Sequence, residues 1–436
     1  MISKLLNIDL IFYNIRRSVL SGLFLFLLSQ IYGNNYNPKI SSIEIIGLSK
    51  TKPYIVKREI QQPINSTIDS SIVKLDRNRI FNLGLFDEVN WQLVPLEDGS
   101  AVLQFSLIES INRLPPFILP SYDEEKGWSL RGAYLIKNFQ GKNRTIELNG
   151  SIGAHEKIQL LFSDPWIYGN HVSLLMYVAK NSYKHLFLNR EVSINTIRMD
   201  FGKWYGEKIK ARFSPAITRR IYTNDIDTLS YNYFIPSLKI IYDSRDIYWH
   251  PRKGIKLINK LSPRIGENEF FIWDQSYSIY LPIFDFQHNI TFAMNLTVKK
   301  KWGYKDDIWL TYLGNSYNIR GWDLPEFIND NSTIVNYRFG HEYLFSTMEL
   351  RKLIIPKHHS RRGLLNGLGI VGFVDAGFIF NKWSNINHEN FIGGAGFGIR
   401  IPIPMLESIR IDLGWGFKNK KFNNSRVWHF AIQQKF

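Results

Sequence analysis

The sequence predicts a small α+β domain followed by a transmembrane antiparallel β-barrel of about sixteen strands. Aromatic residues make up 15% of the chain, as is usual where aromatic side chains line a membrane interface. Beyond an apolar run near the amino terminus, no stretch approaches the roughly 18 apolar residues of a membrane-spanning helix. Strand-length segments separated by polar turns fill most of the chain. A membrane location therefore requires strands, and these must close into a barrel.

Residues 1–33 are interpreted as an export signal. Arg16 and Arg17 precede an apolar run at residues 19–28. A charged segment followed by a short apolar segment is the order of a secretory signal, and the run is short for a bilayer span. An inner-membrane anchor is the alternative, which the long segment before Arg16 leaves open.

Residues 38–110 predict a compact domain with the order strand, helix, helix, strand, strand. A short apolar alternation at residues 43–47 ends in a glycine. Apolar residues then recur at helical spacing between 68 and 83, and Gly84 ends that helix. Two alternating strands follow, joined by a hairpin turn at residues 97–100.

Residues 111–127 are expected to form a linker leading into the barrel, and residues 128–436 the barrel itself. Two segments, 290–299 and 409–418, alternate apolar residues with polar or charged ones. This alternation suits a wall with one side toward lipid and the other toward water. A soluble sandwich also alternates, but it would have to hide all of these apolar faces inside.

The strand-length segments number about sixteen, an even number that suits a closed barrel. The first lies near residues 128–138, one is placed at 307–313, and the last spans 426–436. The last segment ends at the carboxyl terminus in an aromatic pattern that is consistent with an outer-membrane insertion signal. The residues of this pattern are Trp428, Phe430, Ile432 and Phe436.

Charge and motif content exclude several function classes. The formal net charge is +16, but we find no dense Lys/Arg arm and no recognition-helix pattern, so no nucleic-acid partner is expected. Attraction to anionic lipid headgroups and a Lys-rich composition explain the charge instead. The chain has no cysteine, no phosphate-binding loop, no nucleophile elbow and no zinc-binding helix motif. We therefore expect no enzymatic activity, no cofactor and no metal.

A polar connection between two strand segments contains the run Ile319-Arg320-Gly321-Trp322. Gly321 allows a tight backbone turn, Arg320 offers five donors in a fixed geometry, and Trp322 supplies a large apolar wedge. Such a loop could fold back into a barrel lumen. Taken alone, the run is better explained as a solvated loop tip, because Arg-Gly is a common dipeptide.

A second motif lies at the end of a strand segment, where Asp243, Arg245 and Asp246 are followed by Pro251 and Gly254. The carboxylates could be mistaken for a metal or acid/base cluster. The proline and glycine indicate a strand passing into a hairpin, with Arg245 neutralising the carboxylates on either side.

The amino-terminal pattern resembles a polypeptide-transport-associated (POTRA) domain. The matching pieces are Ile43-x-Ile45-x-Gly47, the pair Arg58-Glu59, and the runs at residues 83–89 and 103–109. The resemblance implies binding of unfolded or partner chains by strand addition at a sheet edge, a mode open to any exposed edge. The groove would lie around residues 80–89, and a rigid spacer is the alternative.

The barrel half resembles the outer-membrane insertase and two-partner-secretion transporter superfamily of BamA, TamA and FhaC. The shared pieces are the two motifs above, Glu349-Leu350-Arg351, Phe373-x-Asp375-x-Gly377 and the glycine-rich run at 394–398. The resemblance implies that the loop folds into the lumen, where Arg320 contacts Glu349, Phe373 and Asp375. The alternation agrees, because Phe373 and Asp375 are two residues apart and share one face of a strand.

The chain departs from the family pattern in several places. Asn315 stands where the family often has a second glycine, and Trp322 stands where the family usually has Phe or Tyr. The chain has one POTRA-like region, whereas the main bacterial assembly factor has several. Residues 426–436 contain no glycine, which argues against a glycine kink that opens a lateral seam.

The resemblance implies a non-enzymatic outer-membrane assembly factor, with the barrel in the outer membrane and the POTRA domain in the periplasm. An incoming strand would pair at a seam between the first and last strands. The expected partners are outer-membrane lipids and unfolded outer-membrane or secreted polypeptides, while accessory periplasmic or lipoprotein subunits are left open. The alternatives are a two-partner-type polypeptide secretion transporter and a passive outer-membrane pore.

Overall fold

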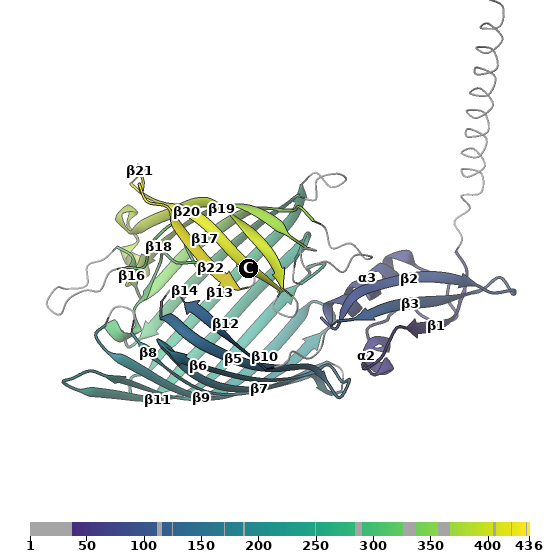
Figure 1. Ribbon diagram of the computed structural model, residues 1–436, viewed down its shortest axis with the longest axis horizontal. Helices are drawn as coiled ribbons and strands as arrows, with labels where there is room; N and C mark the ends of the chain where they lie inside the picture. The colour runs from purple at the N-terminus through teal and green to yellow at the C-terminus, as the bar shows by residue number, and fades with distance from the viewer. Residues whose placement is uncertain are drawn as a thin grey trace, which may run out of the picture.

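The computed structural model describes residues 37–436 except 111–115, 124, 170, 186–187, 249, 284–289, 326–336, 356–366, 404–406, 420 and 433. The expected export signal, residues 1–33, lies outside the described residues. An amino-terminal domain lies at one end of a large strand barrel (Figure 1). Among the described residues, no helix combines the length and the hydrophobicity that a bilayer crossing demands.

The amino-terminal domain packs two helices on a three-stranded sheet. Its elements are β1 (Ile40–Ile46), α2 (Pro53–Lys57), α3 (Ser70–Asn82), β2 (Phe86–Pro95) and β3 (Ala101–Glu109). The strand order is β1-β3-β2, so β1 and β2 are the edge strands. This is the element order that the sequence predicts.

Local sequence explains the long helix of this domain. The Asp69 carboxylate accepts hydrogen bonds from the backbone amides of Ser71 and Ile72, which caps the start of α3. The helix ends before Gly84, which adopts φ +68°. The domain core includes Ile55, Val73, Ile80, Val89 and Phe105.

Most of the remaining strands form one antiparallel ring. The longer ones, in chain order, are β4 (Phe117–Asp123), β5 (Gly127–Phe139), β6 (Arg144–Gly153), β7 (His155–Tyr168), β8 (Val172–Lys184), β9 (Glu191–Tyr205), β10 (Ile209–Thr223), β11 (Thr228–Asp243), β12 (Gly254–Gly266), β13 (Phe270–Ile283), β14 (Ile290–Gly303), β17 (Glu342–Leu353), β18 (Gly369–Phe380), β19 (Phe391–Ile403) and β20 (Glu407–Lys418). The short segments β21 (Lys421–Phe422) and β22 (Val427–Ile432) both pair with β20. Counting these two as one interrupted strand, the described residues form a barrel of sixteen strands, closed between β22 and β4, which confirms the predicted fold class.

Two expected strand positions are nevertheless wrong, and the errors cancel in the count. The first strand of the ring is β4, which lies within the stretch expected to be a linker. Its central Pro120 weakens the strand signal but fits a strand at a seam. The segment at 307–313 is not a barrel strand: it contains the 3₁₀ turn η1 (Asp307–Trp309) and β15 (Thr311–Tyr312). Its apolar side chains, such as the fully buried Leu313, pack inside the protein instead of facing lipid.

Small elements complete the fold. β15 pairs with β16 (Phe339–Gly340) in a separate two-stranded sheet. Two further 3₁₀ turns, η2 (Trp383–Asn385) and η3 (His388–Asn390), lie between β18 and β19.

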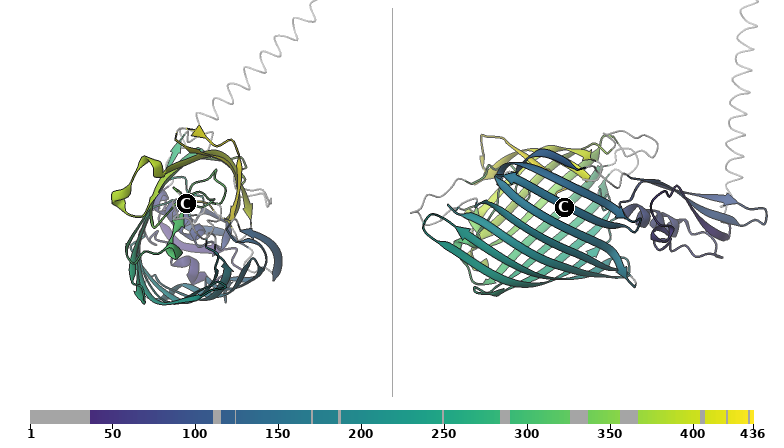
Figure 2. Two further views of the ribbon diagram at one scale, coloured as in Figure 1. Left: turned by 90° about the vertical axis from the view of Figure 1, so that its left-hand side faces the viewer. Right: turned by 60° about the horizontal axis from the view of Figure 1, so that its bottom comes forward.

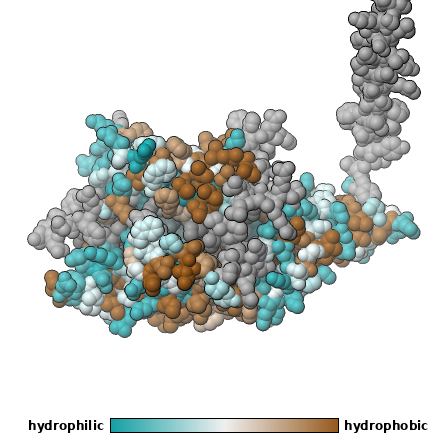
Figure 3. All heavy atoms as spheres, viewed as in Figure 1, coloured by the Kyte–Doolittle hydropathy of each residue, from teal (hydrophilic) through white to brown (hydrophobic). Residues whose placement is uncertain are grey.

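The barrel wall has an apolar outer face and a polar inner face. Ile197, Ile217 and Ile240 are at least half exposed on the outside, and apolar side chains gather on the outer surface (Figure 3). Their sequence neighbours point inward, as the two-residue period of a strand requires. This arrangement suits a wall between lipid and water.

The amino-terminal domain contacts the turns at the near end of the barrel (Figure 2). The Asn82 side chain accepts a hydrogen bond from the Tyr248 amide at 3.2 Å and donates to the Asp246 carbonyl at 3.4 Å. Ile247 packs against the domain core. These three barrel residues belong to the β11–β12 turn, which therefore marks the domain end of the barrel.

Candidate functional site

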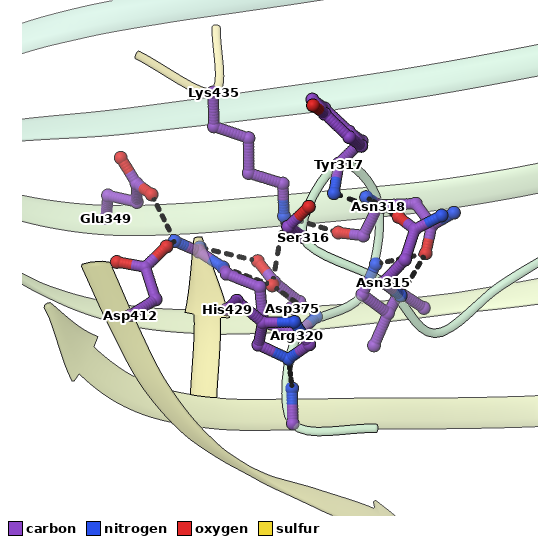
Figure 4. A network of polar contacts seen from close by, with 12 residues as sticks. Asn315, Ser316, Tyr317, Asn318, Arg320, Glu349, Asp375, Asp412, His429 and Lys435 are labelled. Carbon is purple, nitrogen blue, oxygen red and sulfur yellow. Dashed lines mark hydrogen bonds and ion pairs between the residues drawn. The ribbon is translucent and has the colours of Figure 1, made fainter. Parts of the chain in front are cut away.

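The loop at residues 313–323 folds into the barrel interior and is braced by its own side chains (Figure 4). The Asn318 side-chain oxygen accepts hydrogen bonds from the amides of Gly314 and Asn315, at 2.7 and 3.1 Å. The Asn315 side chain accepts in turn from the amides of Tyr317 and Asn318, at 2.9 and 3.0 Å. These reciprocal turns give the loop a defined shape before it meets the barrel wall.

Arg320 is the centre of the site and is completely buried. Its Nε and Nη2 donate to the two oxygens of Asp375 at 2.8 and 3.0 Å, and its backbone amide donates to the same carboxylate at 3.0 Å. Nη1 donates to Glu349 at 2.8 Å. The guanidinium carbon lies 3.5 Å from the ring centroid of Phe373. The structure thus brings Arg320 together with the three side chains named from the sequence.

A third carboxylate, Asp412 on β20, was missed by the sequence analysis. It accepts a hydrogen bond from Arg320 Nη1 at 3.0 Å and another from Arg400 at 2.6 Å. It lies on the polar face of the alternating segment 409–418. Its place among the polar, lumen-facing positions of this alternation was the signal that could have identified it.

The last strand and the residues after it also reach the loop, which the sequence did not indicate. His429 of β22 accepts a hydrogen bond from the Gly321 amide through Nε2 at 2.8 Å. The Lys435 ammonium forms an ion pair with Asp375 at 2.9 Å and donates to the Asn318 carbonyl. These contacts tie the loop to the strand that closes the barrel, and Figure 4 shows both side chains pointing toward it.

Each buried carboxylate of the site has at least one cation besides Arg320. Glu349 pairs with Arg351 at 2.8 Å, Asp412 pairs with Arg400, and Asp375 pairs with Lys435. Buried charges are retained only when they are paired and hydrogen-bonded, so these residues form one cooperative network that holds the loop. We call this network the latch: Arg320, Glu349, Asp375, Asp412 and their cationic partners Arg351, Arg400 and Lys435.

Glycines on the wall make room for the loop backbone. Gly321 has φ +89°, and a Cβ there would lie 2.6 Å from the Gly416 nitrogen. A Cβ at Gly394 would collide with the Arg320 carbonyl oxygen. The glycine-rich run at 394–398 is thus partly explained by close approach of the loop.

Trp322 anchors the far side of the loop. It is 6% exposed, and its indole nitrogen donates to the Gly393 carbonyl at 2.7 Å. Ile319 packs in the same apolar cluster. All four residues of the loop motif therefore contact the barrel interior, and a solvated tip is not observed.

The strand-end motif forms a structured turn. Arg245 binds both oxygens of Asp243, at 2.9 and 2.8 Å. The Asp246 carboxylate accepts from the amides of residues 247 and 252 at 2.9 and 3.0 Å. Pro251 is buried in this turn, and a Cβ at Gly254 would collide with the Ser244 carbonyl oxygen. This is one of the turns that contact the amino-terminal domain.

The aromatic residues at the carboxyl terminus do not all share one surface. Trp428 and Phe430 are 54% and 50% exposed on the outer face of β22. The Phe436 ring instead lies inside the barrel, 4.5 Å from the Arg351 guanidinium and 6.1 Å from the Tyr280 ring. Phe436 does not share the face of Trp428 and Phe430, because β22 ends at Ile432 and the strand alternation ends with it. The role of these residues as an insertion signal stays a prediction. The side chain of Ile432 lies outside the described part of the chain.

Two family models match the chain. The model of the Omp85 superfamily domain matches residues 138–436. The POTRA model, described as a surface antigen variable number repeat, matches residues 38–109.

Solved structures with a similar fold include three bacterial proteins. BamA from Haemophilus ducreyi lacking POTRA domains 1–3 is 15% identical, with a TM-score of 0.56 over 90% of this chain and 85% of that one. CdiB from Acinetobacter baumannii is 13% identical, with a TM-score of 0.54 over 91% and 74% of the two chains. CdiB from Escherichia coli is 10% identical, with a TM-score of 0.51 over 92% and 90%. At these identities the similarity establishes the fold.

Proposed function

The chain belongs to the Omp85 superfamily, and on this premise we propose that it folds β-barrel proteins into the outer membrane by templating their strands at a lateral seam. Members of this superfamily are insertases and transporters rather than enzymes. In this proposal the barrel lies in the outer membrane and the POTRA domain lies in the periplasm.

The observation that carries the proposal is the shortness of the seam strands. β4 has 7 residues and β22 has 6, whereas their neighbours β5 and β20 have 13 and 12. A short seam forms few hydrogen bonds, and backbone groups left unpaired in lipid each cost several kcal/mol. An incoming strand that pairs at this edge would satisfy these groups and be held in register for folding. The templating edge is β4 with β22, so the first-strand partner is residues 117–123 rather than residues 128–138.

The POTRA domain supplies a second edge for an unfolded client. β2 is an edge strand and packs beside α3, so the groove expected at residues 80–89 lies along an open sheet edge. A client segment adding to this edge would form main-chain hydrogen bonds without sequence specificity. The domain contacts the barrel turns, so a segment bound there would be held close to the barrel.

The latch would preserve the barrel shape while seam strands exchange partners. It connects the loop to β17, β18 and β20 through buried ion pairs. His429 connects the same loop to the seam strand β22. A seam that opens would therefore still be attached to the rigid part of the wall.

Depletion of the protein in cells followed by profiling of outer-membrane proteins tests the proposal. If many barrel proteins decrease together, and Arg320→Ala reproduces the defect at equal expression, the assembly function is supported. Loss of one secreted protein from an otherwise unchanged outer membrane would instead identify a dedicated secretion transporter. Ion conductance in proteoliposomes without accelerated barrel folding would identify a passive pore.

A further inference from the structure

A row of charged side chains crosses the inner wall of the barrel, outside the latch. Arg212 on β10 is directly opposite Lys239 on β11, and Lys239 is directly opposite Lys260 on β12. The row continues with Asp274 and then Lys299. We call Arg212, Lys239 and Lys260 the cationic row. Three cations on three adjacent strands, with no carboxylate between them, are an unusual arrangement because like charges directly opposite each other destabilise a sheet.

The row is only partly neutralised by the protein. Asp200 lies 3.7 Å from Arg212, but it is closer to Arg198, at 3.0 Å. Among the described side chains, no carboxylate lies within ion-pair distance of Lys239 or Lys260. Both lysines are half-buried, so they are accessible to water or to a ligand from inside the barrel.

Two more cations on the same wall have nitrogen atoms without a hydrogen-bond partner in the described structure. These atoms are Nε and Nη1 of Arg264 and Nζ of Lys301. Lys301 is 2% exposed and lies 4.2 Å from the centroid of the Phe270 ring. A buried, unpaired charge is costly, and an anionic group that enters the lumen would relieve this cost.

The cations of this wall are arranged along the barrel axis, starting at the end that contacts the amino-terminal domain. Lys210 and Lys256 lie near that end of their strands, and the cationic row lies next along the strands. Arg264 and Lys301 lie further from the domain. Beyond them lies a hydrophobic cluster, and its members include Tyr222, Tyr231, Tyr233, Phe270 and Ile308. A ligand that reaches the row would therefore come from the side of the POTRA domain.

The chemistry of the row suits carboxylates on an extended chain. Neighbouring strands are about 4.8 Å apart, so the three cations span roughly 10 Å across the sheet. Alternate side chains of an extended peptide are about 6.7 Å apart, so two successive acidic side chains on one face can each meet a cation. The row faces the lumen and not the lipid, which removes membrane headgroups as its ligand.

We propose that the wall formed by Arg212, Lys239 and Lys260 is a binding site for acidic segments of an extended polypeptide that enters from the POTRA side. This inference rests on the proposed function only in taking a polypeptide as the client. It adds a substrate preference: clients with acidic stretches are held in the lumen by electrostatic attraction, while the seam pairs backbones regardless of side-chain charge.

The test is a binding titration with the full chain in detergent micelles. The probe is a fluorescent peptide of alternating Glu and Thr, and the reference probe replaces each Glu with Gln. We expect the Glu peptide to bind more tightly, and this binding to weaken as salt is added. The double variant Lys239→Gln with Lys260→Gln should raise the Kd of the Glu peptide at least about tenfold. It removes two hydrogen bonds to charged groups, and each of these contributes about as much free energy as a tenfold change in Kd.

A matched double variant controls for loss of charge alone. Lys180→Gln with Lys352→Gln removes two lysines that are exposed on the outer face of β8 and β17, and it should leave peptide binding unchanged. Heat-modifiable electrophoretic mobility shows whether each variant still forms a folded barrel. Lys239→Glu with Lys260→Glu should shift the preference to a Lys-Thr peptide.

Equal affinity for the Glu and Gln peptides would overturn the proposal, as would unchanged binding in the folded Lys239→Gln, Lys260→Gln variant. Binding of inorganic tripolyphosphate without any binding of the Glu peptide would also overturn it, because the site would then be one for small anions. A proteoliposome folding assay separates the two proposals. If the Glu peptide binds at the row but wild-type protein does not accelerate barrel folding, the site stands and the assembly function fails.

Discussion

Replacement of Arg320 by alanine tests whether the latch holds the loop. The change removes a guanidinium that donates to Asp375, Glu349 and Asp412. Breaking a buried ion pair typically costs 3–5 kcal/mol, because the remaining charge loses its partner. Here each carboxylate keeps a second cation, so we expect the low end of this range, about 3 kcal/mol.

This free energy translates into a measurable opening of the loop. About 3 kcal/mol is roughly a hundredfold change in an equilibrium constant. In Arg320→Ala, the amides of Gly321 and the neighbouring loop residues should therefore exchange hydrogen about a hundredfold faster. Hydrogen exchange followed by mass spectrometry on the folded protein measures this directly.

Two comparisons make the result specific. Arg320→Lys keeps a cation but loses the bidentate geometry, so its exchange should lie between wild type and Arg320→Ala. Amides of β10 to β12, on the other side of the ring, should be unaffected in both variants. Unchanged protection of the loop in Arg320→Ala, with a folded barrel, would refute the idea that the ion pairs hold it.

Three further predictions concern single contacts. Gly321→Ala should displace the loop as strongly as Arg320→Ala, because the new Cβ would collide with the neighbouring strand and the φ of +89° disfavours alanine. Increased protease cleavage near the loop would show this displacement. A wild-type cleavage pattern would contradict the prediction. Lys435→Gln removes one cation from Asp375 and should raise the amide exchange rate of the loop by a smaller factor than Arg320→Ala. The control Lys352→Gln, on the outer face, should leave that rate unchanged. Burial raises the pKa of the Glu109 carboxyl, but hydrogen bonds from Thr51 and Ser49 outweigh this and hold the pKa below its ordinary value of 4.5. Ionised Glu109 therefore stabilises the domain fully above pH 4.5, and this stabilisation is lost as the pH falls through the lower pKa of the folded state. Amide exchange near residues 50–51 should accordingly become faster at low pH, and Glu109→Gln should remove this pH dependence.

Much of the architecture follows from local patterns in the sequence. The order of elements in the amino-terminal domain and the alternation of the barrel strands are visible because helix and strand periods leave a direct record in the sequence. The same period places Phe373 and Asp375 on one face. The pairing of this face with Arg320 came from family resemblance, since no local pattern connects a loop to a strand so far along the chain.

Other features depend on contacts between distant segments. The sequence assigned β4 to a linker because a seven-residue strand with a central proline has a weak pattern of its own. Asp412, His429 and Lys435 enter the site only because closure of the ring brings the last strands beside the loop. Phe436 lies inside the barrel because the strand alternation ends with β22, before the carboxyl terminus.

By itself, the sequence determined the two-part architecture, the alternation of lipid-facing and lumen-facing positions in the clearest strands, and the loop motif. These depend on backbone periodicity and side-chain chemistry within short segments. Only the tertiary structure decided the identity of the first strand, the complete latch and the direct opposition of Arg212, Lys239 and Lys260. Each of these depends on register between strands, which is set by turns and by closure of the whole barrel and not by the residues of any one strand.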